Sequence, residues 1–139
     1  MITPHILIQQ AQKARRLSYC PYSGFAVGAA LLCADGSVYT GCNIENAAFG
    51  PTVCAERTAV FKAISEDHRD FSAIAVVGGP AGQSISKECP PCGVCRQVLR
   101  EFCDDDFPVY LSADGESIRT VLLKELLPES FRADRHLTK

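Results

Sequence analysis

The sequence predicts an α/β fold in which helices cover both faces of a β-sheet. Helical and strand-like patterns alternate in the order helix, hairpin, helix, strand, helix, strand, which is typical of a sheet sandwiched between helices. The 139 residues suit one domain, and the 47% hydrophobic content argues against disorder. No internal repeat or linker interrupts the pattern, so we expect residues 1–139 to form a single domain.

The first half of the chain contains a helix, a hairpin and a loop. Thr3 suits a helix N-cap and Pro4 the first helical position, and apolar residues then recur near helical spacing. A mostly apolar run follows, of the kind that forms a strand buried on both faces, and an Ala-Asp-Gly-Ser turn leads into a second strand. The predicted elements are a helix at 3–17, strands at 25–33 and 38–42, and a loop at 43–52.

The second half alternates helices and strands. Two helices are indicated by the spacing of their apolar residues, and a β-like run is expected to end at Gly78-Gly79-Pro80. Pro128 is expected to stop a last short helix. The predicted elements are helices at 53–66, 92–102 and 120–127, and strands at 71–77 and 107–111. In such folds, active sites gather where strands end and helices begin.

Composition argues against several classes of function. Acidic residues exceed basic ones by 16 to 14, which gives no basis for tight binding to the phosphates of a nucleic acid. No apolar stretch approaches the roughly 20 residues that span a bilayer, and the amino terminus does not read as a signal peptide. We therefore expect a cytoplasmic protein with no nucleic-acid or membrane partner. In a reducing compartment, closely spaced cysteines favour metal binding over disulfides.

Three cysteines and one glutamate have the layout of a hydrolytic zinc site. Glu56 follows Cys54 by two residues, and Cys92 and Cys95 stand three positions apart further along the chain. Three thiolate ligands leave the fourth position of a tetrahedral zinc ion open to water. A carboxylate beside that position can take a proton from water and hand it to a departing amine.

Each of the three cysteines falls in the first turn of a predicted helix. Free N–H groups and the helix dipole favour a thiolate at such a position. Three thiolates and Zn²⁺ sum to a charge of −1, and the neighbouring Arg57 is predicted to offset part of it.

Two other metal centres fit the same spacing. Cys89 would complete a closed four-sulfur zinc site with no open position, and the Cys-x₂-Cys-x₂-Cys run also fits an iron–sulfur cluster. Because two prolines separate Cys89 from the helix start, we interpret it as a bystander. The other cysteines are interpreted as small buried apolar residues and the histidines are assigned no role: Cys20, Cys33, Cys42 and Cys103, and His5, His68 and His136.

Two motifs, Cys54-Ala-Glu-Arg-Thr-Ala59 and Pro91-Cys-Gly-Val-Cys-Arg-Gln97, resemble the cytidine deaminase family. Cys-x-Glu with Pro-Cys-x-x-Cys is a known signature of zinc deaminases and does not follow from spacing alone. Blocks at 21–31, 41–47 and 125–128 agree as well, so the resemblance covers nearly the whole chain. It implies a three-layer α/β/α sandwich with a five-stranded mixed sheet, and the small homotetrameric class rather than the larger dimeric class with a histidine ligand.

The resemblance also implies roles for individual residues. One zinc ion per subunit would be held by the three cysteines and served by Glu56 as proton shuttle, with Arg57 and Gln97 supporting the ligands. The remaining matches are Asn43 and Glu45 to ribose-binding positions, Phe25 to an aromatic that stacks on the pyrimidine, Ala55 to a backbone donor to the base, and Phe131 to an aromatic that reaches a neighbouring subunit's site. The alternative reading is a pair of turn residues for Asn43 and Glu45, and a core residue for Phe25. Phe49 departs from the tyrosine that many relatives carry.

The implied reaction is hydrolysis of cytidine and 2′-deoxycytidine to the uridines and ammonia, as in pyrimidine salvage, by a homotetramer whose active sites are shared between subunits. Two alternatives stay open from the residues. One is a deaminase of a nucleoside antibiotic of the blasticidin S type, against which Phe25 and the Asn43/Glu45 pair argue. The other is a zinc-binding module without catalysis, in which Glu56 is an ordinary helix residue.

Overall fold

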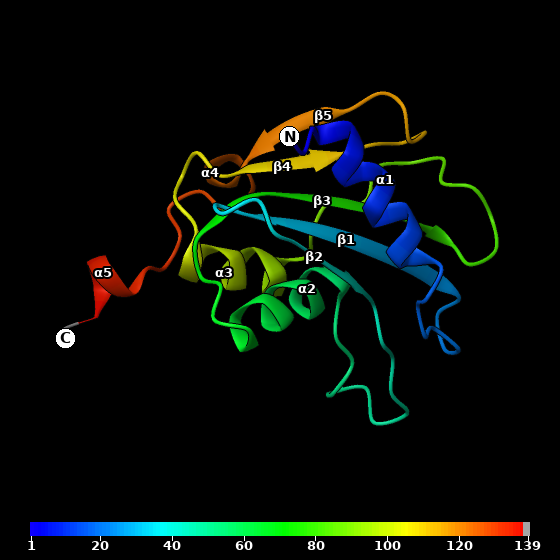
Figure 1. Cartoon of the computed structure of the whole chain (residues 1–139). Helices are drawn as coiled ribbons and strands as arrows, with labels where there is room; N and C mark the ends of the chain where they lie inside the picture. The colour runs from blue at the N-terminus through cyan, green and yellow to red at the C-terminus, as the bar shows by residue number, and fades with distance from the viewer. Residues whose placement is uncertain (138–139) are drawn as a thin grey trace.

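The computed structural model describes residues 1–137 of the chain. Its centre is a five-stranded sheet in the order β2-β1-β3-β4-β5 (Figure 1). The β3–β4 pair is parallel and the other neighbours are antiparallel, so the sheet is mixed, as predicted. The strands are β1 (Phe25–Cys33), β2 (Val38–Cys42), β3 (Phe71–Pro80), β4 (Pro108–Leu111) and β5 (Arg119–Leu122).

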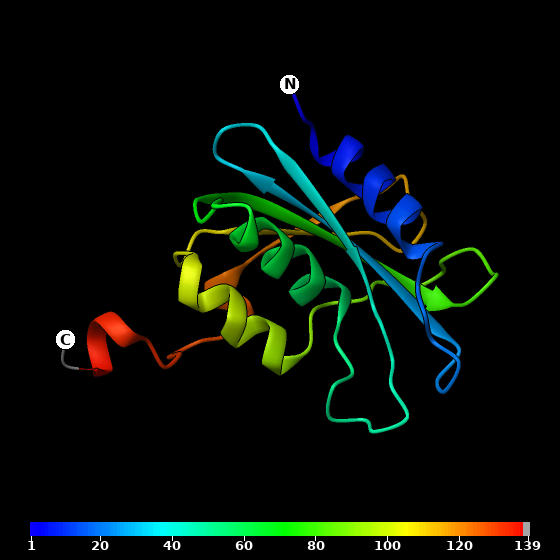
Figure 2. The same cartoon turned by 60° about the horizontal axis from the view of Figure 1, so that its bottom comes forward.

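Helices cover both faces of this sheet, which confirms the three-layer α/β/α architecture. Helix α1 (Pro4–Arg15) lies on one face, whereas α2 (Ala55–Ser65) and α3 (Gly93–Phe102) lie side by side on the other (Figure 2). Two single-turn helices, α4 (Leu123–Leu126) and α5 (Ala133–His136), follow β5. No helix among residues 1–137 is both long and apolar enough to cross a membrane.

The alternation of side chains along β1 explains why both faces need cover. Ala29 and Leu31 belong to the apolar cluster under α2 and α3, whereas Ala30, between them, belongs to the cluster under α1. Successive residues of a strand point to opposite faces, so an apolar run such as this one requires a layer on each side. Helix α1 begins as predicted, because the Thr3 hydroxyl accepts a hydrogen bond from the Ile6 N–H at 3.2 Å.

Several predicted boundaries are wrong, and three of them concern β3, β5 and α2. Strand β3 does not end at the glycines, because Gly78 and Gly79 pair with residues of β1 and extend the strand to Pro80. Residues 120–122, predicted as the start of a helix at 120–127, belong instead to β5, which pairs with β4, and only 123–126 is helical. Helix α2 begins at Ala55 rather than at residue 53, which leaves Cys54 as its N-cap.

Gly28 lies where α1 crosses β1 at close range. A Cβ added there would overlap the Ala11 carbonyl and would lie 2.6 Å from the Arg15 backbone nitrogen. Gly28→Ala is therefore expected to lower the free energy of unfolding by about 3 kcal/mol, because neither backbone group can move freely. Urea denaturation checks this against Gly50→Ala, where the nearest atom is 3.6 Å from the added carbon and stability should hardly change. Equal stability of the two variants would contradict the expectation.

Candidate metal centre

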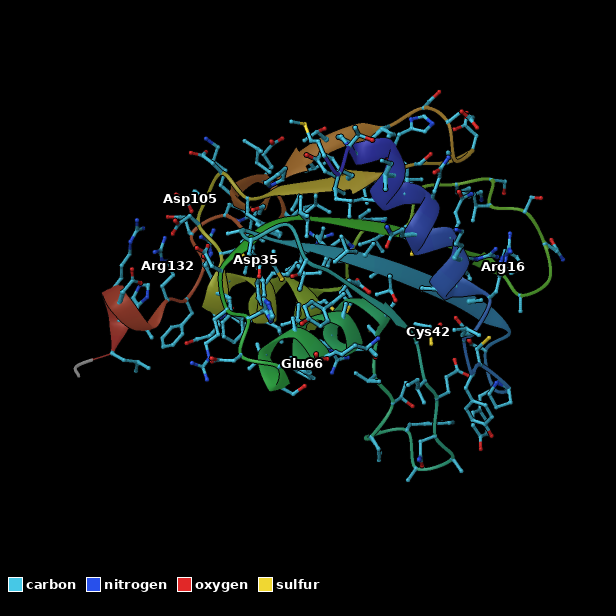
Figure 3. All side chains as sticks on the ribbon, viewed as in Figure 1. Arg16, Asp35, Cys42, Glu66, Asp105 and Arg132 are labelled. Atoms are coloured by element: carbon cyan, nitrogen blue, oxygen red, sulfur yellow. The ribbon has the colours of Figure 1, made fainter. Side chains whose placement is uncertain are left out.

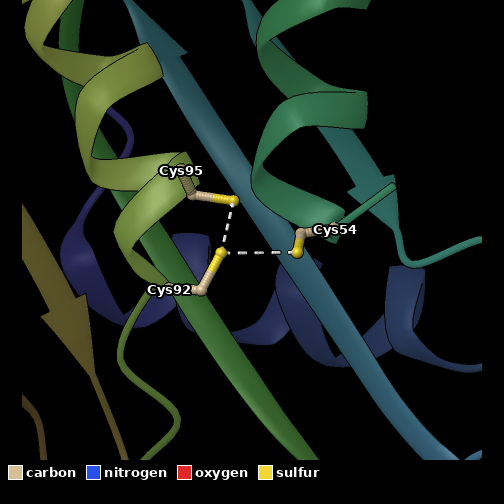
Figure 4. Close-up of side chains that lie close together, drawn as sticks. All are labelled: Cys54, Cys92 and Cys95. Atoms are coloured by element: carbon tan, nitrogen blue, oxygen red, sulfur yellow. Dashed lines mark hydrogen bonds between the residues drawn. The ribbon is translucent and has the colours of Figure 1, made fainter. Parts of the chain in front are cut away.

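The starts of α2 and α3 meet beside the sheet, and three thiols converge between them (Figure 4). Cys54 is the N-cap of α2, Cys92 is the N-cap of α3, and Cys95 is the third residue of α3. A loop from β2 leads into α2 and another from β3 leads into α3. The predicted convergence is therefore present, with two of the thiols just before their helices rather than inside the first turn.

The three sulfur atoms have the spacing that a tetrahedral zinc ion requires. The Sγ atom of Cys92 lies 3.7 Å from that of Cys54 and 3.5 Å from that of Cys95. All three lie within 4.8 Å of one another. Zinc–sulfur bonds of about 2.3 Å at tetrahedral angles place the sulfur atoms about 3.8 Å apart. The donor set therefore fits zinc in both chemistry and spacing.

Glu56 is a buried carboxylate beside the thiols. Only 4% of the residue is exposed, and its Oε1 atom has no hydrogen-bond partner among residues 1–137. Burial, and then the negative charge on Cys54, raises the pKa of Glu56 to about 7. A cation held by the thiols acts in the opposite direction. A buried polar atom left without a partner costs free energy, so this oxygen is suited to a ligand that the site receives.

Arg57 lies against the thiols, as the charge argument predicts. Its Nη2 atom is 3.4 Å from the Cys54 sulfur. A hydrogen bond with the Cys95 thiol, followed by the contact with Arg57, lowers the pKa of Cys54 to about 5 although burial opposes it. The same shared hydrogen bond, together with burial, raises the pKa of Cys95. The opposite shifts mean that the Cys54 thiolate is stabilised first and that metal binding must displace the proton of Cys95.

Cys89 is not a member of the three-thiol group. It packs against β3 instead, where a Cβ added at Gly78 would lie 2.7 Å from its sulfur. Burial, and then the nearby charges of Glu56 and Cys54, raises the pKa of Cys89 to about 11, so the thiol stays protonated at neutral pH. This environment favours the bystander interpretation over a fourth ligand.

Cys89→Ser is expected to keep one zinc ion per chain and wild-type turnover, because Cys89 is not one of the thiols expected to bind the metal. Metal analysis of the purified variant checks the zinc content, and a turnover assay checks the activity. A variant that purifies without zinc would establish a closed four-sulfur site instead. Cys42→Ser serves as the matched control, since Cys42 is also a half-buried cysteine outside the three-thiol group.

Asn43 joins the end of β2 to the start of β1. Its Oδ1 accepts from the Val27 N–H at 2.9 Å, and its Nδ2 donates to the Phe25 carbonyl at 2.8 Å. An amide has two acceptor lone pairs and two donor hydrogens, so one of each remains for a ligand. Phe25 is 42% exposed, which argues against the alternative reading of Phe25 as a core residue.

Glu45 organises the turn that precedes β1. Its carboxylate accepts from the backbone N–H groups of Tyr22 and Ser23 and from the Ser23 hydroxyl. These bonds lower the pKa of Glu45, the hydroxyl contributing most. The side chain also lines a hollow of about 320 Å³ together with Tyr22, Ser23, Phe49 and Thr52. Phe49, which departs from the tyrosine that many relatives carry, therefore lines the same hollow as Glu45.

The remaining predicted residues are spread along α2, α3 and the carboxyl-terminal segment. Ala55 is fully buried as the first residue of α2. Phe131 is 56% exposed, its ring stacks on His136, and its carbonyl accepts from Gln97 Nε2 at 3.0 Å. No role is assigned to Arg96 from the sequence. Its position directly after Cys95 was the one feature of the sequence that could have suggested a role near the thiols.

The four cysteines that were interpreted as buried apolar residues divide into two pairs. Cys33 and Cys103 are buried, as predicted, but Cys20 and Cys42 are only half-buried. His68, which was expected in a surface segment, makes two side-chain contacts: its ring nitrogens lie 3.0 Å from the Tyr39 hydroxyl and 3.0 Å from the Asp35 carboxylate. None of these residues belongs to the three-thiol group.

Residues 1–111 match the family model described as the cytidine and deoxycytidylate deaminase zinc-binding region. A cytidine deaminase of Halalkalibacterium halodurans is 52% identical over 129 residues, which are 93% of this chain and 94% of that protein. A cytidine deaminase of Sporosarcina psychrophila is 50% identical over 125 residues, 90% of this chain and 88% of that protein. A blasticidin-S deaminase of Bacillus cereus is more distant, with 31% identity over 76% of each chain.

Solved structures give the same result. The crystal structure of a cytidine deaminase from Burkholderia pseudomallei superposes with a TM-score of 0.84 and 44% identity, over 93% of this chain and 99% of that one. The cytidine deaminase from Mycobacterium tuberculosis superposes with a TM-score of 0.75 and 39% identity, over 91% of this chain and 94% of that one.

Proposed function

Because the chain belongs to the cytidine and deoxycytidylate deaminase family and is a zinc-dependent cytidine deaminase, we propose that its three clustered thiols hold the zinc ion and that Glu56 moves the protons of the reaction. The observation that carries this assignment is the placement of the buried Glu56 carboxylate, two residues after Cys54, the N-cap residue of α2, and with one oxygen lacking a partner within residues 1–137.

The proposed mechanism divides the work between the metal and one carboxylate. Zinc, when bound, lowers the pKa of water from about 15.7 to about 7 and so supplies a nucleophile at neutral pH. Glu56 Oε1 accepts the proton that the water gives up and donates it to the ring nitrogen N3 as the water oxygen adds to C4. The carboxylate then takes the proton of the new C4 hydroxyl and donates it to the amino group, which leaves as ammonia while C4 becomes a carbonyl. Burial keeps bulk water away from this carboxylate, so the proton is passed to the substrate rather than lost to solvent.

Binding of the nucleoside is assigned to residues around the start of β1. Asn43 and Glu45 each keep hydrogen-bonding capacity beyond their backbone contacts, which supports their assignment to the ribose hydroxyls. The exposed ring of Phe25 is available to stack on a pyrimidine. The turn-residue reading and the binding role are therefore compatible, because the same side chains shape the loop and face the substrate. Both cytidine and 2′-deoxycytidine are proposed substrates.

We propose a homotetramer with shared active sites. Support comes from a group of exposed apolar side chains close to the proposed substrate residues: Tyr19, Tyr22, Phe25, Ile44 and Phe49, which are 42–72% exposed. Apolar groups of this kind mark interaction surfaces. Dilution should therefore abolish turnover as the subunits separate, measured by light scattering and activity on the same samples. Fully active monomers would overturn shared sites and leave the metal assignment intact.

Three further parts of the proposal follow from the sequence. A single domain spanning residues 1–139 is supported by the one continuous sheet within the described part of the chain. A cytoplasmic location is supported by thiolate ligands, which last longest in a reducing compartment. A place in pyrimidine salvage is supported by the nucleoside substrate itself.

One assay tests the substrate assignment. The purified protein is mixed with cytidine, 2′-deoxycytidine or blasticidin S, and the loss of absorbance that accompanies release of the amine is followed. We expect turnover of the two nucleosides and slow or no turnover of the antibiotic. Faster turnover of blasticidin S would change the substrate assignment and leave the proposed zinc and Glu56 chemistry intact. A zinc-loaded protein that turns over none of the three compounds would favour the non-catalytic zinc-binding module.

A further inference from the structure

The Arg96 side chain connects the start of its own helix to the end of α4. Its Nε donates to the Pro91 carbonyl at 2.7 Å, and its Nη1 donates to the Leu126 carbonyl at 2.7 Å. The residue is half-buried, and both acceptors are backbone oxygens. Short hydrogen bonds from a charged donor are stronger than neutral ones, and the planar guanidinium fixes the direction of both.

The bond to Pro91 acts on the residue before a proposed zinc ligand. A peptide unit is planar, so fixing the Pro91 carbonyl oxygen also fixes the nitrogen and Cα of Cys92. The Pro91 side chain is fully buried, and the rings of Pro90 and Pro91 restrict the backbone that leads into α3. Arg96 therefore completes the immobilisation of a thiol that is itself exposed.

The bond to Leu126 acts on the carboxyl-terminal segment, residues 127–137. Leu126 is the last residue of α4, where carbonyl groups lack helical partners, and Arg96 supplies one. The next residue of α3, Gln97, donates to the Phe131 carbonyl at 3.0 Å. Arg132 adds an ion pair to Asp105 at 3.9 Å (Figure 3). Two consecutive residues that follow Cys95 therefore bind the chain directly before the segment, at Leu126, and within it, at Phe131.

We propose that Arg96 is a positioning residue that couples zinc retention to docking of the carboxyl-terminal segment. The inference rests on the proposed role of Cys92 as a zinc ligand. Bound zinc fixes Cys92 and the start of α3, which keeps the Arg96 guanidinium in place to bind Leu126. A docked segment in turn holds Arg96 against Pro91. The coupling is reciprocal, since two sites that share one element must bias each other equally.

The first experiment measures zinc release from the loaded protein to a chromogenic chelator. Arg96→Lys keeps the charge but lacks the fork that reaches both carbonyls, so we expect release about 10-fold faster, within the range typical for partners of metal ligands. Arg15→Lys is the matched control. Arg15 is the last residue of α1, on the other face of the sheet, and its guanidinium also joins backbone carbonyls, including those of Ala26 at 2.9 Å and Pro80 at 2.7 Å, neither of which is next to a ligand. Its zinc release should equal that of the wild type.

The second experiment measures hydrogen exchange of residues 127–137 in the wild-type protein, loaded with zinc and after chelation. We expect slower exchange in the loaded form, and a loss of this difference in Arg96→Lys. The coupling would be overturned if Arg96→Lys released zinc at the wild-type rate. It would also be overturned if residues 127–137 of the wild type exchanged equally fast with and without zinc. The wild-type comparison decides the matter alone if the variant does not fold. A wild type that holds no zinc at the three thiols would overturn the proposed function instead.

Discussion

Replacing Glu56 with glutamine is expected to abolish turnover while the protein keeps its zinc. Glutamine preserves the size of the side chain but cannot accept the proton from water, so the loss should be at least the 10²–10⁴-fold typical of a positioned acid–base group. The carboxylate is buried and one of its oxygens has no partner within residues 1–137, so the amide fits without losing a protein contact. Steady-state turnover of cytidine and metal analysis of the same preparation make the measurement.

Glu101→Gln is the matched control for this result. Glu101 is an exposed residue of α3, and it undergoes the same chemical change away from the thiols. It should keep wild-type turnover. A Glu56→Gln protein that is as active as this control would remove Glu56 from the mechanism, and one that has lost its zinc would show that the carboxylate supports the metal rather than the proton transfer.

Replacing Cys95 with serine is expected to remove the zinc ion and, with it, all measurable turnover. A serine hydroxyl is not a thiolate, and two remaining thiols do not make the three-ligand set of a catalytic site. Only 1% of Cys95 is exposed, so an exposed side chain from elsewhere on the surface cannot readily reach this position and replace the missing thiolate. Zinc content per chain and turnover should fall together in the variant.

Chelation of the wild type provides an independent form of the same test. Activity should disappear as zinc leaves and should return when zinc is added back, because the folded chain retains its thiols. Cys103→Ser, which changes a buried cysteine outside the three-thiol group, should keep both zinc and activity. Full activity in zinc-free protein would exclude a role for the metal in the reaction.

The local parts of this structure could be predicted from the sequence because local signals determine them. The cap at Thr3, the apolar period of α3 and the Asp-Gly turn each act over a few residues, and the predicted elements lie close to the observed ones. The approach of Cys54 to Cys92 was also predictable, since both precede helices that follow strands of one sheet.

The parts that were missed depend on distant neighbours. Strand β5 has four residues with no strong pattern of its own, and it is a strand because it pairs with β4. Gly78 and Gly79 look like a turn until β1 supplies partners for them. The two contacts of Arg96 reach Pro91 and Leu126, and the second lies 30 residues away, so no local rule predicts it.

The nine residues of β1 separate its two ends by about 30 Å at about 3.3 Å per residue. Phe25 and the loop that holds Asn43 and Glu45 lie at one end, and the exposed turn at Asp35 and Gly36 lies at the other. A dye or surface linker attached at this turn would therefore stand a strand's length from Phe25 and the proposed ribose-binding loop. An enzyme immobilised through Asp35 would present the proposed nucleoside-binding end to the bulk liquid.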